Sequence, residues 1–159
     1  MRHVQLSAVV RGQAAEHVLH TIRQWDRFPA LAPHVRSTEI HPTADGPSSS
    51  SWELYFRSGL LTWTEEEVID LAALVIAFAQ TEGDFDTFSG AWRIAQAGTD
   101  CTVLFEADFD FGIASLEGIL DPIAERVIRE TAAWALVGLF PDVTVDTEPS
   151  RDGTTPVSV

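Results

Sequence analysis

The sequence predicts an α+β domain in which a curved antiparallel sheet surrounds one long C-terminal helix. One observation is a run of strict alternation near the C-terminal third of the chain. Its apolar members are Val103, Phe105, Ala107, Phe109 and Phe111, and between them stand Leu104, Glu106, Asp108 and Asp110. A period of two with one acidic side is typical of an antiparallel strand that has one face in water. A second observation is that a helical pattern follows Gly112. A sheet curved around such a helix encloses space for a ligand.

The N-terminal part begins with a strand and a short helix. Residues 4–10 alternate between apolar and polar or small side chains, and Gly12 ends this strand. Residues 14–23 have a helical apolar side. Pro29 and Pro33 then restrict the chain to a turn or a short second helix, because proline fixes φ and lacks an N–H.

Six more strands are expected before the long helix, which makes about seven in all. We predict them over Val35–Pro42, Trp52–Arg57, Leu61–Asp70, Ala73–Gln80, Phe85–Ile94 and Thr102–Phe111. The stretch Thr43–Ser50 is rich in serine and contains Pro, Gly and Asp, which is the composition of a loop.

The C-terminal helix is defined by apolar residues three to four positions apart. They are Leu116, Leu120, Ile123, Val127, Trp134 and Val137. Pro122 allows two interpretations: the main helix begins there with Asp121 as its N-cap, or a lead-in turn is kinked there. We predict one domain over residues 1–144 and a disordered tail over 145–159, because the tail has little to bury.

The net charge narrows the class of partner. Ten arginines face 24 acidic residues, for a formal charge of −14. Proteins that bind nucleic acid need a basic surface that releases phosphate counterions, so we expect no nucleic-acid partner. Anionic membranes are disfavoured for the same reason. A neutral, apolar or weakly polar small molecule is the remaining class.

Motifs for other sites are missing from the sequence. No apolar run has the length of a membrane span. Residues 1–4 enter a strand pattern at once, so we expect no secretory signal peptide. The single cysteine, Cys101, agrees with a reducing cytoplasm. The His17/His20 pair has no third ligand nearby, so we expect neither a metal nor another cofactor.

Several motifs, taken in order, resemble a known family. They are Glu82-Gly83-Asp84-Phe85, Gly90-Ala91-Trp92, the Gly98-Thr99 turn, the alternating strand and, earlier, Trp25–Pro33. Together, over residues 3–140, they are similar to the helix-grip proteins: START-related domains, polyketide aromatase/cyclases and coenzyme-Q-binding proteins. The resemblance implies a sheet wrapped around the C-terminal helix, with two short helices closing one end of a ligand cavity.

Glu65 and Glu67 are the candidate catalytic residues. They share one face of their predicted strand with Trp63 and Ile69. In the cyclases, the matching positions point into the cavity, and one of them is usually an arginine, whereas this chain has Glu67 there. If both carboxyls are inside, burial and repulsion raise a pKa and suit them to acid–base work. If the register places them at the rim, they are surface charges.

The remaining candidates would shape the cavity. Trp92 matches a tryptophan that lines the cyclase cavity, and a purely structural core position is the other interpretation. Trp25 and Phe28 lie where the family has the cavity mouth. Arg57 could replace the missing arginine if its strand turns that face inward. The full set of expected substrate-binding residues is Trp25, Phe28, Arg57, Trp63, Phe88, Trp92, Phe105, Phe109, Leu116, Ile123 and Val127.

Two functions follow from the resemblance. The first is a cofactor-independent polyketide cyclase or aromatase that promotes aldol cyclisation and dehydration of a poly-β-ketone. An acyl carrier protein is then a candidate donor of the substrate, and a homodimer stays open. The alternative is a non-catalytic carrier or self-resistance protein that binds a quinone, a lipid or a finished metabolite.

Overall fold

A computed structural model of the protein describes residues 1–44 and 46–146. The strands are β1 (Arg2–Val10), β2 (Val35–His41), β3 (Ser48–Phe56), β4 (Gly59–Asp70), β5 (Val75–Gly83), β6 (Thr87–Ala97), β7 (Asp100–Asp110) and β8 (Val143–Asp146). The helices are α1 (Ala15–Ile22), η1 (Trp25–Arg27), α2 (Phe28–Leu31), η2 (Ala114–Leu116) and α3 (Glu117–Leu139). The predicted α+β order is confirmed.

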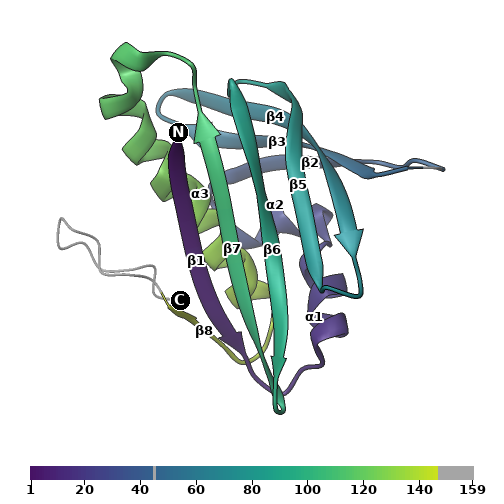
Figure 1. Ribbon diagram of the computed structural model, residues 1–159. Coiled ribbons are helices and arrows are strands. Elements are labelled where there is room, and N and C mark those ends of the chain that lie inside the picture. The colour runs from purple at the N-terminus through teal and green to yellow at the C-terminus, as the bar shows by residue number, and fades with distance from the viewer. Residues whose placement is uncertain (45, 147–159) are drawn as a thin grey trace.

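All the strands of the described residues form one antiparallel sheet. Its order is β2-β3-β4-β5-β6-β7-β1-β8, so the first strand closes onto β7 and the ends of the sheet are β2 and β8. Figure 1 shows the strands curving across one side of the molecule while α3 crosses behind them. The short helix α1 packs against β6 and α3, and α2 packs against β2 and α3. This is the helix-grip arrangement that the sequence predicts.

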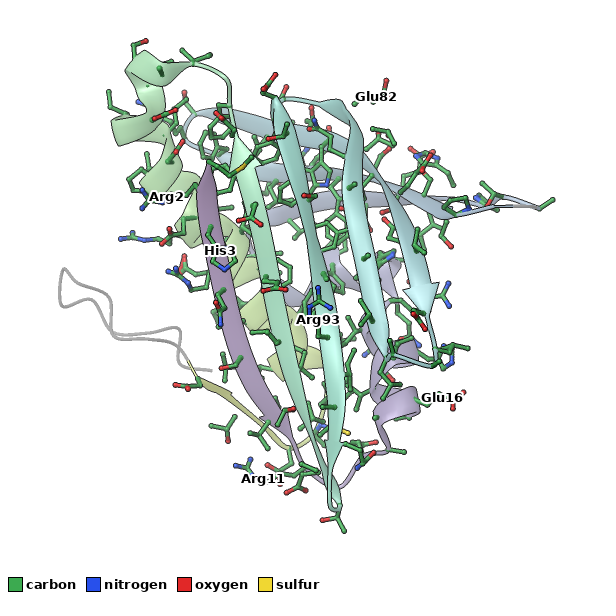
Figure 2. All side chains as sticks on the ribbon, in the orientation of Figure 1. Arg2, His3, Arg11, Glu16, Glu82 and Arg93 are labelled. Atoms are coloured by element: carbon green, nitrogen blue, oxygen red, sulfur yellow. The ribbon has the colours of Figure 1, made fainter. Side chains whose placement is uncertain are left out.

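The sheet has one buried and one wet face, as the alternation in β7 predicts. Along β7, Val103, Phe105 and Phe109 are buried on the side of α3. On the other side, Glu106 accepts a hydrogen bond of 2.9 Å from Arg93, and Asp108 lies 2.8 Å from His3. Figure 2 shows Arg93 and His3 on the face of the sheet turned away from α3. The acidic face is therefore the outer one.

Several strand ends differ from the predicted ones by two or three residues, and three other sequence-based boundaries change in ways that matter. The serines of residues 48–51 begin β3 rather than extend the preceding loop, because they pair with Thr64–Glu67 of β4. The helix α3 begins at Glu117 and passes through Pro122, so Asp121 is a buried helical residue and not an N-cap.

The third boundary is at the C-terminus. The strand β8 pairs with Ser7–Val10 of β1 and reaches Asp146, so the described part of the sheet has eight strands and the body extends beyond residue 144. Residues 147–159 of the expected tail lie outside the described residues. No helix in the described ranges combines the length and the apolar character of a transmembrane segment.

Candidate functional site

A cavity lies between the concave face of the sheet and α3. Its volume is about 50 Å³. The wall is formed by Trp25, Phe28, Trp52, Leu54, Trp63, Glu65, Phe78, Phe88, Trp92, Phe105, Ile128, Thr131 and Ala132. These residues come from η1, α2, five neighbouring strands and the middle of α3. The cavity is therefore enclosed by both layers of the fold and is mostly aromatic.

The aromatic wall is held by ring-to-ring packing. Trp52 and Trp63 face each other across the β3–β4 pair and stack with an interplanar angle of 2° and a centroid distance of 5.9 Å. Trp25 meets Trp52 edge to face at 5.8 Å, and Trp92 meets Phe105 at 4.7 Å. Such pairs contribute beyond their buried area, so the packing of the rings stabilises the wall.

The register of β4 carries two glutamates into the interior. Leu61, Trp63, Glu65 and Glu67 are buried, whereas Glu66 and Val68 are exposed on the other face. The exposed fraction is 5% for Glu65 and 1% for Glu67. Glu65 is part of the cavity wall, and Glu67 lies behind it along the strand. The inward interpretation of the two glutamates is thus the one that the structure shows.

A chain of hydrogen bonds fixes the two carboxyls. The Trp63 indole N–H donates to Glu65 Oε1 at 2.8 Å. The Ser50 hydroxyl donates to Glu67 Oε2 at 2.7 Å and accepts from the Trp52 indole N–H at 2.8 Å. The other oxygen of Glu67, Oε1, is buried and receives no hydrogen bond from the described residues. The site therefore contains one carboxylate oxygen that lacks a donor.

Burial raises the pKa of the Glu65 carboxyl well above its ordinary value. The neighbouring Glu67 carboxyl adds to the increase through hydrogen bonding and charge repulsion, while the hydrogen bond from Trp63 opposes it. A proton kept by Glu65 can be donated to Glu67, which would give the buried oxygen of Glu67 a partner. Their burial on one face of β4 and the raised pKa of Glu65 would allow the two carboxyls to share a proton.

Most of the expected cavity residues lie at the wall. They are Trp25, Phe28, Trp63, Glu65, Phe88, Trp92 and Phe105. The structure brings them together because η1 and α2 fold over the open end of the sheet, against β2 and α3. Trp92 and Trp63 are thus both core and wall residues, which reconciles the two interpretations of Trp92.

Five expected substrate-binding residues lie away from the wall, and the position of the cavity explains the first three. It faces Ile128, Thr131 and Ala132, so the earlier turns of α3 lie beyond it. Leu116 is 37% exposed, and Ile123 and Val127 pack at the core without reaching the cavity. In Figure 1, the first turns of α3 project past the end of the sheet.

The fourth is Phe109, which is fully buried and packs on Phe85 with ring centroids 5.6 Å apart. It belongs to the solid core at the end of β7.

Arg57 is not a cavity residue. It occupies the exposed turn between β3 and β4 with φ of 57°, outside the alternation that turns Trp52 and Leu54 inward. No arginine of the described ranges is part of the wall, and the sequence contains no lysine. The arginine of the cyclases thus has no substitute here.

Sequence reasoning missed Ser50, Trp52, Leu54, Phe78, Ile128, Thr131 and Ala132. Ser50 is fully buried and holds Glu67, yet it stands in a serine run that suggests a loop. The alternation Ser50, Trp52, Leu54 was the available signal, since it continues the inward face of β3. Among the described residues, no group of three potential metal ligands comes together.

A family comparison gives this architecture a context. The model of the family described as polyketide cyclase/dehydrase and lipid transport matches residues 12–135. The chain belongs to this family. None of the curated proteins matches it significantly.

Solved structures share the fold at low sequence identity. TTHA0849 from Thermus thermophilus is 22% identical with a TM-score of 0.75, and the match covers 87% of this chain and 94% of that one. The Zhui aromatase/cyclase from Streptomyces sp. R1128 is 20% identical, with a TM-score of 0.73 and coverage of 87% and 93%. A START superfamily protein from Mycobacterium smegmatis is 18% identical, with a TM-score of 0.70 and coverage of 86% and 94%. The START-like fold of the family member is thereby established.

Proposed function

We propose that this family member binds a poly-β-ketone or aromatic intermediate in its cavity and promotes aldol cyclisation and dehydration without a cofactor. The observation that carries the proposal is the buried Glu65–Glu67 pair, in which Glu65 is at the cavity wall and has a raised pKa. A carboxyl with a raised pKa holds its proton more tightly and can act as a general acid, and its ionised form can act as a base.

In the proposed reaction, Glu65 donates its proton to a ketone oxygen of the bound chain. The α-carbon that attacks this ketone loses a proton to the carboxyl pair, so the C–C bond forms without a net change in the pair's proton count. In the dehydration, the pair protonates the leaving hydroxyl, which departs as water, and takes the α-proton as the double bond forms. The tryptophan wall would fold the chain so that the reacting atoms meet, which lowers the entropic barrier.

The cavity is small, so the proposed function requires it to open for the substrate. Pockets for drug-sized ligands have volumes of roughly 300–1,000 Å³, whereas this cavity has about 50 Å³. We propose that Trp25 and Phe28 swing outward when ligand enters, because they lie on the short η1 and α2 segments rather than on the sheet. An acyl carrier protein remains our candidate donor of the substrate.

A second function is favoured by the charge of the wall. An enolate needs positive charge or donors near its oxygen, and no arginine is present there. A carrier of a quinone, a lipid or a finished metabolite would not need them. The family description, which includes lipid transport, agrees with this alternative.

The two functions are separated by product analysis with a carrier-bound poly-β-ketone. If the protein is a cyclase, wild type shifts the products toward one ring pattern, and Glu65→Gln reduces this rate about 10²–10⁴-fold. The matched control is Glu66→Gln, which removes the same charge from the exposed face of β4 and leaves the rate unchanged. Tight binding of hydrophobic molecules with no change in products would overturn the cyclase and leave the carrier.

A further inference from the structure

The cavity wall is acidic as well as aromatic. Among the described residues that form the wall, Glu65 is the only one with an acidic or basic side chain, and it lies beside Glu67. The remaining polar wall residue, Thr131, donates its hydroxyl to the Val127 carbonyl oxygen at 2.7 Å. The chemistry that the wall offers to a ligand is thus a carboxyl pair surrounded by ring faces.

The ring faces favour positive charge. Eight of the wall residues are aromatic, and four of these are tryptophans. An indole face attracts a cation by its quadrupole, and the attraction increases when water is excluded. The N–H groups of Trp52 and Trp63 already donate to Ser50 and Glu65, so these two donors are not available to an anionic ligand.

The unpartnered oxygen of Glu67 is an independent observation. Glu67 is 1% exposed, and its Oε1 has no donor among the described residues. A buried acceptor without a donor is costly, so the site favours a group that supplies N–H or O–H. A proton on Glu65 can do so. A protonated amine placed against Glu65, the member of the pair at the wall, would donate to that carboxyl and bring a compensating charge to the pair.

We propose that the cavity, opened by the outward movement of Trp25 and Phe28, selects ligands bearing one protonated amine on an aromatic group, with the nitrogen against Glu65 and the ring among the tryptophans. This inference rests on the proposed function in that it takes this cavity as the binding site, and it adds the chemical class of the ligand. The net charge of −14 would also concentrate cations near the protein.

Three probes of similar size test the charge preference: benzylamine, benzyl alcohol and benzoate, which are cationic, neutral and anionic at neutral pH. Their affinities are measured by titration calorimetry and by tryptophan fluorescence at a fixed salt concentration. We expect benzylamine to bind at least tenfold more tightly than benzyl alcohol, and benzoate to bind most weakly. Equal or tighter binding of benzyl alcohol overturns the inference while ligand binding in the cavity stands. Binding of none of the three overturns both.

Substitutions test whether the preference for a cationic ligand comes from the Glu65–Glu67 pair. Glu65→Gln and Glu67→Gln are near-isosteric substitutions. Each should lower the ratio of the benzylamine affinity to the benzyl alcohol affinity at least tenfold. Glu66→Gln changes the net charge equally from the exposed face and should keep the ratio within twofold. If Glu66→Gln also lowered this affinity ratio tenfold, the charge preference would come from general surface charge and not from the pair. That result would overturn the inference. If a buried variant does not fold, the three wild-type affinities decide alone.

Discussion

Ser50 and Glu67, on the neighbouring strands β3 and β4, are joined by a hydrogen bond of 2.7 Å at a position closed to solvent. They are diagonal partners, because Ser50 lies directly opposite Glu65 and Ser48 lies opposite Glu67. Ser50 also accepts the Trp52 indole N–H. One small hydroxyl therefore connects the aromatic wall to the carboxyl pair.

Replacing Ser50 with alanine should destabilise the protein by about 2 kcal/mol. The change leaves a buried carboxylate oxygen and the Trp52 N–H without their partner, and hydrogen bonds to charged groups are worth about 1.5–3 kcal/mol. Urea denaturation measures the loss. The control is Ser49→Ala: its half-buried hydroxyl donates to the Glu65 carbonyl oxygen, and its loss should cost less than about 1 kcal/mol. Equal losses in the two variants would contradict the special role of Ser50.

Glu65 should make the fold less stable as the pH rises. Below the ordinary glutamate pKa of about 4.3, Glu65 is protonated in both the folded and the unfolded chain. Above it, the unfolded chain releases the proton while the folded protein, with its raised pKa, retains it. Stability then falls by about 1.4 kcal/mol per pH unit until the pH reaches the folded pKa.

The variant Glu65→Gln cannot titrate, so it should match wild type near pH 4 and exceed its stability at pH 7. Denaturation curves of both proteins across this range give the difference directly. Glu66→Gln, on the exposed side of β4, should not reproduce the divergence. Parallel curves for wild type and Glu65→Gln would show that burial does not perturb this carboxyl.

The sequence predicted the sheet better than the position of the cavity under α3. Period-two patterns set strand faces, because a shift by one residue would turn every apolar side chain of β7 into water. The same rule gave the face shared by Trp63, Glu65 and Glu67, and the structure shows this face inside. An apolar helical stripe cannot show which of its turns faces a cavity, so Leu116 and Ile123 were expected at the wall in place of Ile128 and Thr131.

Ser50 shows that the composition of a segment is not enough to distinguish a loop from a strand. A run of serines is typical of loops, and only pairing with β4 shows that Ser48–Ser51 form a strand. The hydrogen bonds of Ser50 depend on tertiary contacts, which the neighbouring sequence does not predict. The partner of Glu67 could therefore not be named from sequence.

Gly90 should tolerate no side chain. A Cβ there would lie 2.7 Å from Phe78 Cζ and even closer to the Glu106 carbonyl oxygen, so Phe78 would be forced toward the cavity. Overpacking typically costs 1–3 kcal/mol, and with a backbone atom in the way we expect Gly90→Ala to lose at least about 2 kcal/mol. Gly118→Ala, whose Cβ meets nothing within 4 Å, is the control and should be neutral or slightly stabilising. Thermal denaturation of both variants checks this, and an unchanged melting temperature for Gly90→Ala would disprove the steric argument.

The strand β8 should contribute to stability and protect the edge of β1. It pairs with Ser7–Val10, its Val143 and Val145 pack against the core, and Arg11 donates to the Thr144 hydroxyl at 2.8 Å. A chain ending after Asp142 lacks these contacts, whereas one ending after Asp146 keeps them. We expect the shorter chain to be less stable by about 1–3 kcal/mol, the scale of burying two valines in part.

The shorter chain should also self-associate, since the freed β1 edge exposes unpaired backbone groups. Denaturation and light scattering on the two truncated chains measure both effects. Equal stability and equal monomer content would show that β8 adds nothing to the sheet.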